Sequence, residues 1–419
     1  MNKLYTFLIA SIFSISGYAQ TTVNIVTGAG YANDVYYSFD NGSVSTSPRA
    51  EWDIAFATGR YNVSVLANNG SMVELYTYPN GDISAWNSVD ISDIESWPQM
   101  YNSVVHLYDG AFLQNAVQGD DFDYGWGRYN MGTHHIVGDS IYIIKTTAGN
   151  NKKLCIVEKN PNSGVNSWEI KYADTDGSNE HTVTISADPY SSKNYVYYSL
   201  ENNQIIDREP ASDEWELNFT KYFDYNIPYS VTGVLINSTR VTAHEVDAVS
   251  AATYETYDET LFNDSISIIG SDWKTFNMGT MSYDLDDDRV YFVKVMNEEG
   301  LDSNYWKMYF TGFSGSSDGT YTFVQKKIEA ATSLNAINEI AMMEVYPNPA
   351  TNQINVIYDS SDDVTISIFD LSGKIVYRKK YASHGFEKQI ISVNNLKSGV
   401  YNIIVESVNS VSHTKLIKQ

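Results

Sequence analysis

The chain has 419 residues, with 27 Lys and Arg against 51 Asp and Glu, a formal net charge of −24, and one cysteine, Cys155. This charge would repel phosphates, which argues against nucleic acid and anionic membrane surfaces as partners, and a single cysteine excludes a disulfide framework within the chain. The length allows two or three domains, and the 33 tyrosines with many polar turn residues favour strands, so we expect an all-β protein.

Residues 1–19 have the pattern of a secretory signal peptide. Lys3 supplies the positive start, residues 7–15 form a mostly apolar run, and Gly17 and Ala19 provide small residues before a cleavage site at Gln20. No cysteine follows that site, so we do not expect a lipoprotein. A retained membrane anchor is the alternative, but the apolar run is only about half of a spanning helix. We therefore expect export and a mature chain that begins at Gln20.

One nine-residue segment occurs twice. Residues 126–134 read Trp-Gly-Arg-Tyr-Asn-Met-Gly-Thr-His, and residues 273–281 read Trp-Lys-Thr-Phe-Asn-Met-Gly-Thr-Met. Further segments match in the same order: 35–39 with 196–200, 51–56 with 214–219, 141–145 with 290–294, and 168–172 with 306–310. Such a series is typical of an internal repeat. We therefore predict two tandem β domains, 20–187 and 188–328, and expect the second to fold when expressed alone.

The elements within the repeats are predicted to be short strands. Alternating apolar and polar segments such as 52–56 and 142–145 are separated by Asn-Gly, Asp-Gly and Pro-Asn turns. The one helix that the pattern predicts is short, near 92–100, with Asp90 or Ser92 as its N-cap. After the second repeat, the small residues of 329–343 indicate a linker.

The last unit, 344–419, holds 8 of the 27 basic residues and 7 of the 51 acidic ones, so nearly all the negative charge belongs to the repeats. Pro and Gly turns punctuate its apolar segments, as in Tyr-Pro-Asn-Pro-Ala at 346–350, Ile-Ser-Ile-Phe-Asp-Leu-Ser-Gly-Lys at 366–374 and Leu-Lys-Ser-Gly-Val-Tyr at 396–401, before a basic apolar end at 413–419. This pattern predicts a small β-sandwich that can stand alone.

In the order and spacing of these motifs, 344–419 resembles the type A C-terminal sorting domain of type IX secretion cargo in Bacteroidetes. The resemblance implies export through the outer membrane and contact with the type IX secretion machinery. It also implies removal of the unit by a sortase-like protease, followed by release or attachment to surface lipopolysaccharide. The expected location is therefore extracellular or on the outer-membrane surface.

The repeats resemble the HmuY family of haem-binding proteins. The similarity rests on Glu-Trp-Asp-Ile-Ala-Phe at 51–56, the aromatic-Asn-Met segment after a Trp, the strands at 141–145 and 290–294, and Trp-Lys-Met-Tyr-Phe at 306–310. That family is all-β, captures haem outside the cell, and holds the iron between two side chains, which are His in some members and Met in others. The resemblance implies two HmuY-like β domains with haem as cofactor.

The resemblance places one iron ligand on Met131 in the first repeat and on Met278 in the second. Thioethers are soft ligands that suit haem iron. The second ligand does not carry over, and the upstream candidates are His106, with Met100, in the first repeat and His244 in the second. The residue pattern leaves another interpretation open, because in a strand each Met would share a face with an aromatic two residues earlier, which usually means core packing.

Motifs for catalysis are incomplete. His244-Glu245 opens like a zinc-protease helix, but Ala248 stands where the second His is required. The alternating Asp residues of 284–288 suggest a calcium loop, but Arg289 replaces the turn glycine. His134 and His135 would point to opposite faces of a strand and could not bind one metal together. A carboxylate pair for glycoside hydrolysis has no fixed sequence spacing and stays open.

We therefore predict a secreted, non-enzymatic binding protein. Haem or porphyrin capture, including capture from host haem proteins, is the first hypothesis. A surface adhesin or glycan-binding protein that uses the same fold without haem is the alternative. A buried His or Met pair facing one apolar cleft would favour haem, whereas exposed aromatic side chains on a flat face would favour the adhesin.

Overall fold

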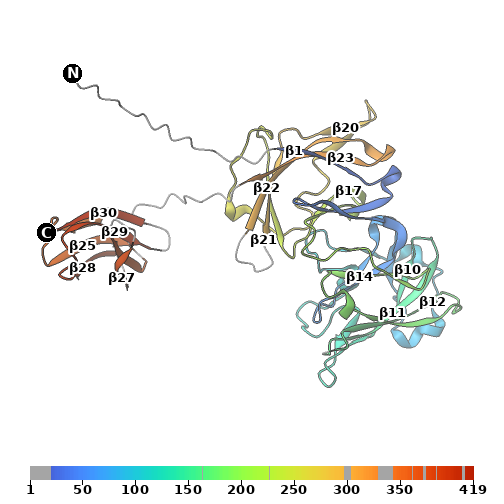
Figure 1. Ribbon diagram of the computed structural model, residues 1–419. Helices are drawn as coiled ribbons and strands as arrows, with labels where there is room; N and C mark the ends of the chain where they lie inside the picture. Colours follow the sequence, from blue (N-terminus) through green and yellow to red (C-terminus); the bar gives the residue numbers. More distant parts are fainter. Residues whose placement is uncertain are drawn as a thin grey trace. The chain divides into compact units, whose positions relative to one another are not determined.

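The computed structural model describes residues 20–162, 164–225, 227–296, 303–328, 343–360, 362–370, 374–383, 385–407 and 411–419 (Figure 1). These residues form strands β1 to β30 and short 3-10 helices η1 to η9, with no α-helix among them, which confirms the all-β prediction. The chain divides into two compact units, 1–328 and 329–419. The predicted signal peptide, 1–19, and the predicted linker, 329–343 apart from its last residue, lie outside the described residues.

The first unit contains two lobes, each with its own buried apolar core. What we call the terminal lobe is built from both ends of the unit: β1 (Thr21–Val26), β2 (Asn33–Ser38), β3 (Gly42–Pro48), β16 (Leu217–Asp224), β17 (Tyr229–Ile236), β18 (Val241–Val246), β19 (Lys274–Asn277), β20 (Ser282–Leu285), β21 (Val290–Met296), β22 (Ser303–Phe313) and β23 (Thr320–Ile328). Its sheets run β1-β23-β22-β21-β18 and β17-β16-β2-β3, with β19-β20 as a separate hairpin.

The middle lobe comes from the intervening chain: β4 (Ile54–Ala57), β5 (Val65–Ala67), β6 (Glu74–Thr77), β7 (Gln99–Met100), β8 (Gly127–Tyr129), β9 (Ile136–Gly138), β10 (Tyr142–Lys145), β11 (Asn151–Asn160), β12 (Ser167–Asp174), β13 (His181–Ser186), β14 (Tyr195–Ser199) and β15 (Gln204–Ile206). Its sheets run β13-β12-β11-β10-β6-β7 and β15-β14-β4-β5, and the β8-β9 hairpin joins the first of them through β11. The strand orders of the two lobes correspond, as a duplication requires.

The 3-10 helices are single turns or little more: η1 (Ala29–Tyr31), η2 (Arg49–Glu51), η3 (Asn69–Ser71), η4 (Ile83–Ser88), η5 (Ile94–Ser96), η6 (Ala111–Leu113), η7 (Asp188–Tyr190), η8 (Glu259–Leu261) and η9 (Gly315–Ser317). The helix predicted near 92–100 is wrong, because that segment contains only η5 and β7. Asp90 does accept the Ser92 N–H at 2.9 Å. Pro98, however, holds Trp97 in an extended conformation (φ −83°, ψ 144°), which ends any helix there.

The two sequence repeats exchange strands. The hairpin β2-β3 of the first repeat pairs with β16 of the second, Tyr37 opposite Leu217 and Val35 opposite Phe219. In return, β14-β15 of the second repeat pairs with β4 of the first. The opening strand β1 likewise pairs with the last strand, β23 (Figure 1). β13 occupies the place of β1 and so opens the second repeat, which puts the duplication point between β12 and β13, ahead of the predicted boundary between 187 and 188.

The sheet order also corrects one of the sequence matches. β10 and β21 occupy equivalent places, so β11 corresponds to β22 and β12 to β23. Trp168 lies in β12, whereas Trp306 lies in β22, so 168–172 and 306–310 belong to strands that are not equivalent. Both segments alternate aromatic and polar residues because both strands bury one face, and that shared alternation produced the match.

Two buried tyrosines meet where the lobes join. The hydroxyls of Tyr36 and Tyr197 lie 3.3 Å apart and share a hydrogen bond. Trp215 packs edge-on against Tyr36, and Trp52 packs edge-on against Tyr197, with 4.9 Å between ring centroids in each pair. Tyr36 and Tyr197 are equivalent in the two repeats, as are Trp52 and Trp215, so these contacts have the reciprocal pattern of a two-fold interface.

An acidic side chain just before β4 and another just before β16 each bind the backbone of the exchanged hairpin beside that strand. Asp53 accepts a hydrogen bond from the Leu200 N–H at 2.8 Å, and its equivalent in the second repeat, Glu216, accepts one from the Phe39 N–H at 2.9 Å. Both bonds are buried, where an unpaired backbone N–H would cost roughly 1–3 kcal/mol. Each repeat thus supplies a carboxylate that holds the other repeat's hairpin.

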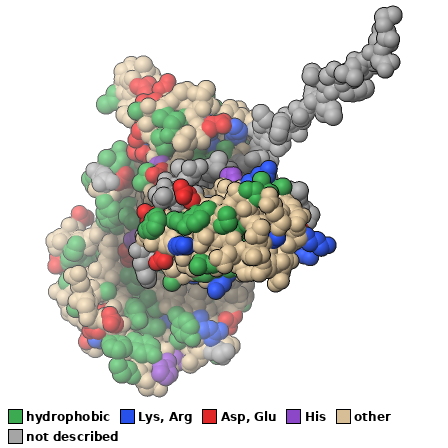
Figure 2. All heavy atoms as spheres, turned by 90° about the vertical axis from the view of Figure 1, so that its left-hand side faces the viewer, with side chains coloured by type: hydrophobic (Ala, Val, Ile, Leu, Met, Phe, Trp, Pro, Cys, Tyr) green, Lys and Arg blue, Asp and Glu red, His purple; other side chains and the backbone are tan. Residues whose placement is uncertain are grey.

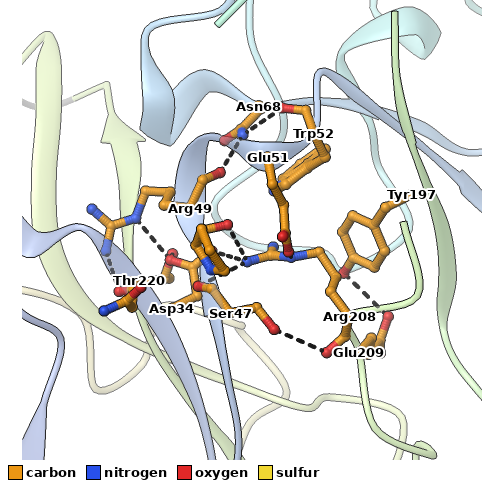
Figure 3. Close-up of polar contacts among 12 residues, drawn as sticks. Asp34, Ser47, Arg49, Glu51, Trp52, Asn68, Tyr197, Arg208, Glu209 and Thr220 are labelled. Carbon is orange, nitrogen blue, oxygen red and sulfur yellow. Dashed lines mark hydrogen bonds and ion pairs between the residues drawn. The ribbon is translucent and has the colours of Figure 1, made fainter. Parts of the chain in front are cut away.

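A buried charge cluster ties together the two segments that cross between the lobes (Figure 3). Asp34, on β2, accepts hydrogen bonds from Arg49 Nε at 2.7 Å, Arg208 Nη2 at 2.9 Å and Thr220 Oγ1 at 2.7 Å. Arg208 Nε also donates to Glu51. Burial alone would raise the pKa of Asp34, but the charges of Arg208 and Arg49 outweigh it and hold the pKa below its ordinary value.

Glu209 has the opposite environment. Its carboxylate is fully buried and accepts the N–H groups of Asn194 and Tyr195 and the hydroxyl of Tyr197, yet burial still raises its pKa to about 7. The neighbouring Arg208 is already engaged by Asp34 and Glu51, so its charge offsets only part of the cost of burying the carboxylate.

The second unit is a separate small sandwich with its own core. Its strands are β24 (Met343–Tyr346), β25 (Gln353–Ser360), β26 (Val364–Phe369), β27 (Ile375–Tyr381), β28 (Gly385–Ser392), β29 (Gly399–Glu406) and β30 (Val411–Lys418). They form two sheets, β24-β25-β28 and β27-β26-β29-β30. Inward residues such as Ile354, Ile366 and Ile403 are fully buried, in agreement with the predicted sandwich.

The strand exchange predicts that residues 188–328 do not fold alone. This fragment lacks β1, β2 and β3, and with them Ile25, Val35 and Tyr37 of the terminal-lobe core. Fusing 20–49 through a short Gly-Ser linker to 208–328 keeps both arginine partners of Asp34 and should restore folding, because Ser47 Oγ lies 3.5 Å from the Arg208 carbonyl oxygen and the ends to be joined are close. Circular dichroism and thermal melting of both proteins provide the test. Cooperative melting of 188–328 alone would contradict the exchanged arrangement.

Glu209 predicts a loss of stability as the pH rises. A carboxyl with a raised native pKa stabilises the fold most below its unfolded pKa, near 4.5, and this contribution is lost as the pH passes 7. Between pH 5 and pH 8 the loss should be roughly 2–3 kcal/mol. Glu209→Gln should have a lower free energy of unfolding at every pH, and that free energy should lack the decrease between pH 5 and pH 8, as measured by urea unfolding. Glu216 and Glu245 also have raised pKa values, but they contribute equally in the wild type and the variant. If the free energy of unfolding depends on pH equally in the two proteins, the assignment to Glu209 is refuted.

Candidate functional site

The repeated Trp–Met segment forms a hairpin in each lobe. Asn130 Oδ1 accepts the backbone N–H groups of Gly132 and Thr133, and Asn277 Oδ1 accepts those of Gly279 and Thr280. An Asn side chain that bonds the backbone two residues ahead stabilises a tight turn. The recurrence of Asn-Met-Gly-Thr is therefore explained by turn chemistry, and each Met occupies a turn position.

The four predicted ligand residues occupy separate positions. Met131 is 67% exposed and Met278 is 82% exposed, each in its turn. His106 is exposed in the loop before η6, and His244 is half-buried on β18 with its ring edge-on to Phe262. No hydrogen bond, ion pair or ring contact joins any two of the four within the described residues. The alternative of core packing also fails for both methionines, because exposed side chains do not fill a core.

The β8-β9 hairpin is one wall of a groove in the middle lobe. What we call the first-copy groove has a volume of about 720 Å³ and is lined by Arg60, Tyr61, Val63, Tyr124, Tyr129, His134, Ile136, Pro161 and Asn162. Tyr61 is 85% exposed, on the loop between β4 and β5. Tyr129 is held by a 2.7 Å hydrogen bond between its hydroxyl and His134 Nδ1 and by stacking on Phe122. The fully buried Trp126 supports the floor, since its Nε1 donates to the Val63 carbonyl oxygen at 3.0 Å.

The β19-β20 hairpin has the same place beside a second groove, in the terminal lobe. The second-copy groove has a volume of about 630 Å³ and is lined by Tyr31, Val104, Lys221, Tyr222, Asp224, Ile227, Tyr229, Ser230, Val231, Thr232, Ser267, Gly270, Ser271, Asp272, Lys274, Thr275, Phe276 and Tyr283. Tyr229 and Phe276 are 60% and 45% exposed. Phe276 contacts Tyr283 edge-on at 5.1 Å, so the aromatic wall is continuous.

Lys274 lines the second-copy groove and is largely buried. Its Nζ donates to the Thr232 carbonyl oxygen at 2.6 Å and to that of Ser271 at 3.2 Å, and it lies 4.3 Å from the centre of the Trp273 ring. Burial lowers the pKa of Lys274 to about 7. Asp272, which also lines the groove, is paired with Arg289, whose Nη1 lies 3.0 Å from its Oδ2.

The two grooves are similar in composition. Each is open to solvent and is lined by several aromatic side chains together with polar groups. Tyrosine rings offer an apolar face together with a hydroxyl, which suits ligands that are apolar on one side and polar at the edge. Sequence reasoning identified the hairpins but missed the grooves, because Tyr61 lies in a loop and Tyr229 at the start of β17, both outside the repeated segment. Both are exposed aromatic residues, for which burial cannot account.

A smaller cavity of about 130 Å³ lies between the lobes, beside Tyr36, Trp52, Tyr197 and Trp215. It falls below the roughly 300–1,000 Å³ of typical small-molecule sites. Trp52 and Trp215 are buried in this junction. No group of three or more His, Cys, Asp or Glu residues with the arrangement of a metal site occurs among the described residues.

Four acidic side chains, Glu245, Asp247, Asp272 and Asp286, surround the guanidinium of Arg289. On the face shown in Figure 2, acidic side chains are spread over the surface in small groups. In the part of the chain that the structure describes, no helix is long and apolar enough to cross a membrane.

Comparison with known proteins identifies the second unit. Residues 344–419 match the family model of the secretion system C-terminal sorting domain, which confirms the predicted type IX sorting domain with the same bounds. The protein is thus secreted or attached to the cell surface. No curated protein sequence matches the chain. A solved structure titled "Biofilm associated protein - BSP domain" aligns with 100% of this chain and 84% of its own at 8% identity, but its TM-score of 0.16 is too low to support an argument.

The exposed turn positions predict that Met131→Ala and Met278→Ala each change the free energy of unfolding by less than about 0.5 kcal/mol. Met308→Ala, at a fully buried position, should cost roughly 2–5 kcal/mol and is the matched control. Urea unfolding measures all three. A haem titration of the same proteins tests ligation, which requires a Soret band in the wild type that the Met131 and Met278 variants lose. A large stability loss from either turn variant would contradict the hairpin geometry.

Proposed function

We propose that the protein is a non-enzymatic glycan-binding adhesin of the cell surface or extracellular medium, which binds sugar chains in the first-copy and second-copy grooves. The single observation behind this proposal is that the two repeats, despite different loops, both place an open, tyrosine-rich groove beside the same hairpin. The sorting domain at 344–419 carries the protein out through the type IX machinery, where a sortase removes that domain.

The chemistry of the grooves suits a pyranose ring. The C–H face of a sugar is weakly positive and apolar, so it packs on the electron-rich face of an aromatic ring. The sugar's hydroxyls need donors and acceptors at the rim, which Asn162 provides in one groove and Asp224 and Asp272 in the other. Both grooves are open at the mouth, so a polymer can enter and leave without any part of the protein closing over it.

Haem capture through HmuY-like domains is the weaker hypothesis. It needs two axial side chains that converge on one apolar cleft. Met131 and Met278 instead project from separate turns, and neither contacts His106 or His244 in the described structure. The exposed aromatic side chains line grooves instead of the flat face expected of the adhesin, and they support the proposal because their rings are open to a sugar.

The proposal predicts that Tyr61→Ala and Tyr229→Ala each weaken glycan binding about tenfold, a change of roughly 1.4 kcal/mol, in the groove that loses its ring. Binding is measured by affinity electrophoresis in gels that contain polysaccharides of different composition. Leu261→Ala is the control, because Leu261 is 54% exposed but lines neither groove. Wild-type protein whose migration no polysaccharide retards would contradict the proposed function.

A further inference from the structure

The first-copy groove contains an arginine with no acidic partner. In the described structure the other arginines each have a carboxylate oxygen at 2.6–3.5 Å: Arg49, Arg128, Arg208, Arg240, Arg289 and Arg378. Arg60 is the one described arginine for which no such pair is seen. On a protein with a net charge of −24, where acids outnumber bases almost two to one, an unpaired guanidinium in a groove requires an explanation.

The geometry holds Arg60 in place without neutralising it. Its Nη1 donates to the Pro161 carbonyl oxygen at 3.0 Å, which fixes the guanidinium against the opposite wall of the groove. A neutral carbonyl accepts one of the five N–H donors and leaves the charge in place. The remaining donors are available to a ligand in the groove.

No carboxylate lines this groove, whereas Asp224 and Asp272 line its counterpart. Glu158 Oε2 lies 3.0 Å from His135 Nδ1, and the charge of Asp188 acts on the buried Lys159. The surface around Arg60 is therefore locally basic on an acidic protein. At physiological salt the Debye length is about 8 Å, so groups inside the groove outweigh the distant negative charge for a bound ligand.

We infer that the first-copy groove binds an acidic sugar unit, whose carboxylate or sulfate pairs with Arg60 while its ring packs on Tyr61 or Tyr124. This inference rests on the proposed glycan binding and adds the charge of the ligand. A guanidinium offers two parallel N–H donors to a planar carboxylate, a pairing that is stronger than a neutral hydrogen bond.

The test uses the purified protein with both units and two pairs of polymers that differ only in charge. Polygalacturonate is compared with its methyl ester, and dextran sulfate with dextran, which separates carboxylate from sulfate as the source of the anion. Arg60→Gln should weaken binding of the acidic polymer about tenfold and leave binding of the neutral polymers unchanged. Arg60→Lys should recover part of the affinity, because the charge returns without the planar fork.

Arg128→Gln is the matched control, because it removes the same charge from an exposed, ion-paired arginine that does not line the groove. Equal losses from Arg60→Gln and Arg128→Gln would mean non-specific attraction and would overturn the inference. Neutral polymers bound as tightly as acidic ones, with Arg60→Gln without effect, would overturn it too while leaving the proposed function intact. Failure to bind any polymer would refute both, and unchanged thermal melting shows that each variant is folded.

Discussion

The reciprocal pairing of β2 with β16 and β14 with β4 is the constraint on which the first unit depends. Neither repeat can complete its four-stranded sheet without a hairpin from the other, so the two lobes fold as one body. The hydrogen bond between Tyr36 and Tyr197 lies at the centre of this exchange, and the carboxylates of Asp53 and Glu216 fix the exchanged hairpins on either side of it. The arrangement resembles a domain-swapped dimer whose subunits have been joined into one chain.

Much of this fold could be predicted from the sequence, and the parts that could not share a physical cause. The alternation at 52–56 and the Asn-Met-Gly-Thr turns are local, so the strand β4 and both hairpins followed from them. The sequence does not show which hairpin pairs with which strand, because the two hairpins are nearly identical and far apart in the chain. Val35 and Val196, for example, are each followed by Tyr-Tyr-Ser. The match of Trp168 with Trp306 was wrong for the same reason. β22 is equivalent to β11, the neighbour of β12, and neighbouring strands with similar patterns of buried residues cannot be told apart from the sequence.

The candidate site was only partly predictable. The repeated segment led to the hairpins beside both grooves, and its two methionines are exposed turn residues, because a turn recurs for its Asn and Gly as readily as a ligand site recurs for its Met. The groove walls also come from segments outside the hairpins, such as 58–64 and 227–232, whose sequences differ between the repeats. After duplication the shared hairpin kept the geometry, while the loops were free to change the charge of each groove, as Arg60 and Asp224 illustrate.

The pairing of the first strand with the last has a mechanical consequence. β23 ends at Ile328, where the chain leaves the first unit, and it is bonded on one side to β1 and on the other to β22. Tension applied at that end, as on an adhesin that holds a ligand while its C-terminal side is fixed, pulls β23 along its own axis. The hydrogen bonds on both sides are then loaded together in shear, instead of being peeled apart singly as they would be on an edge strand. Closing the sheet with the N-terminal strand thus places the point of greatest force on a strand with two neighbours.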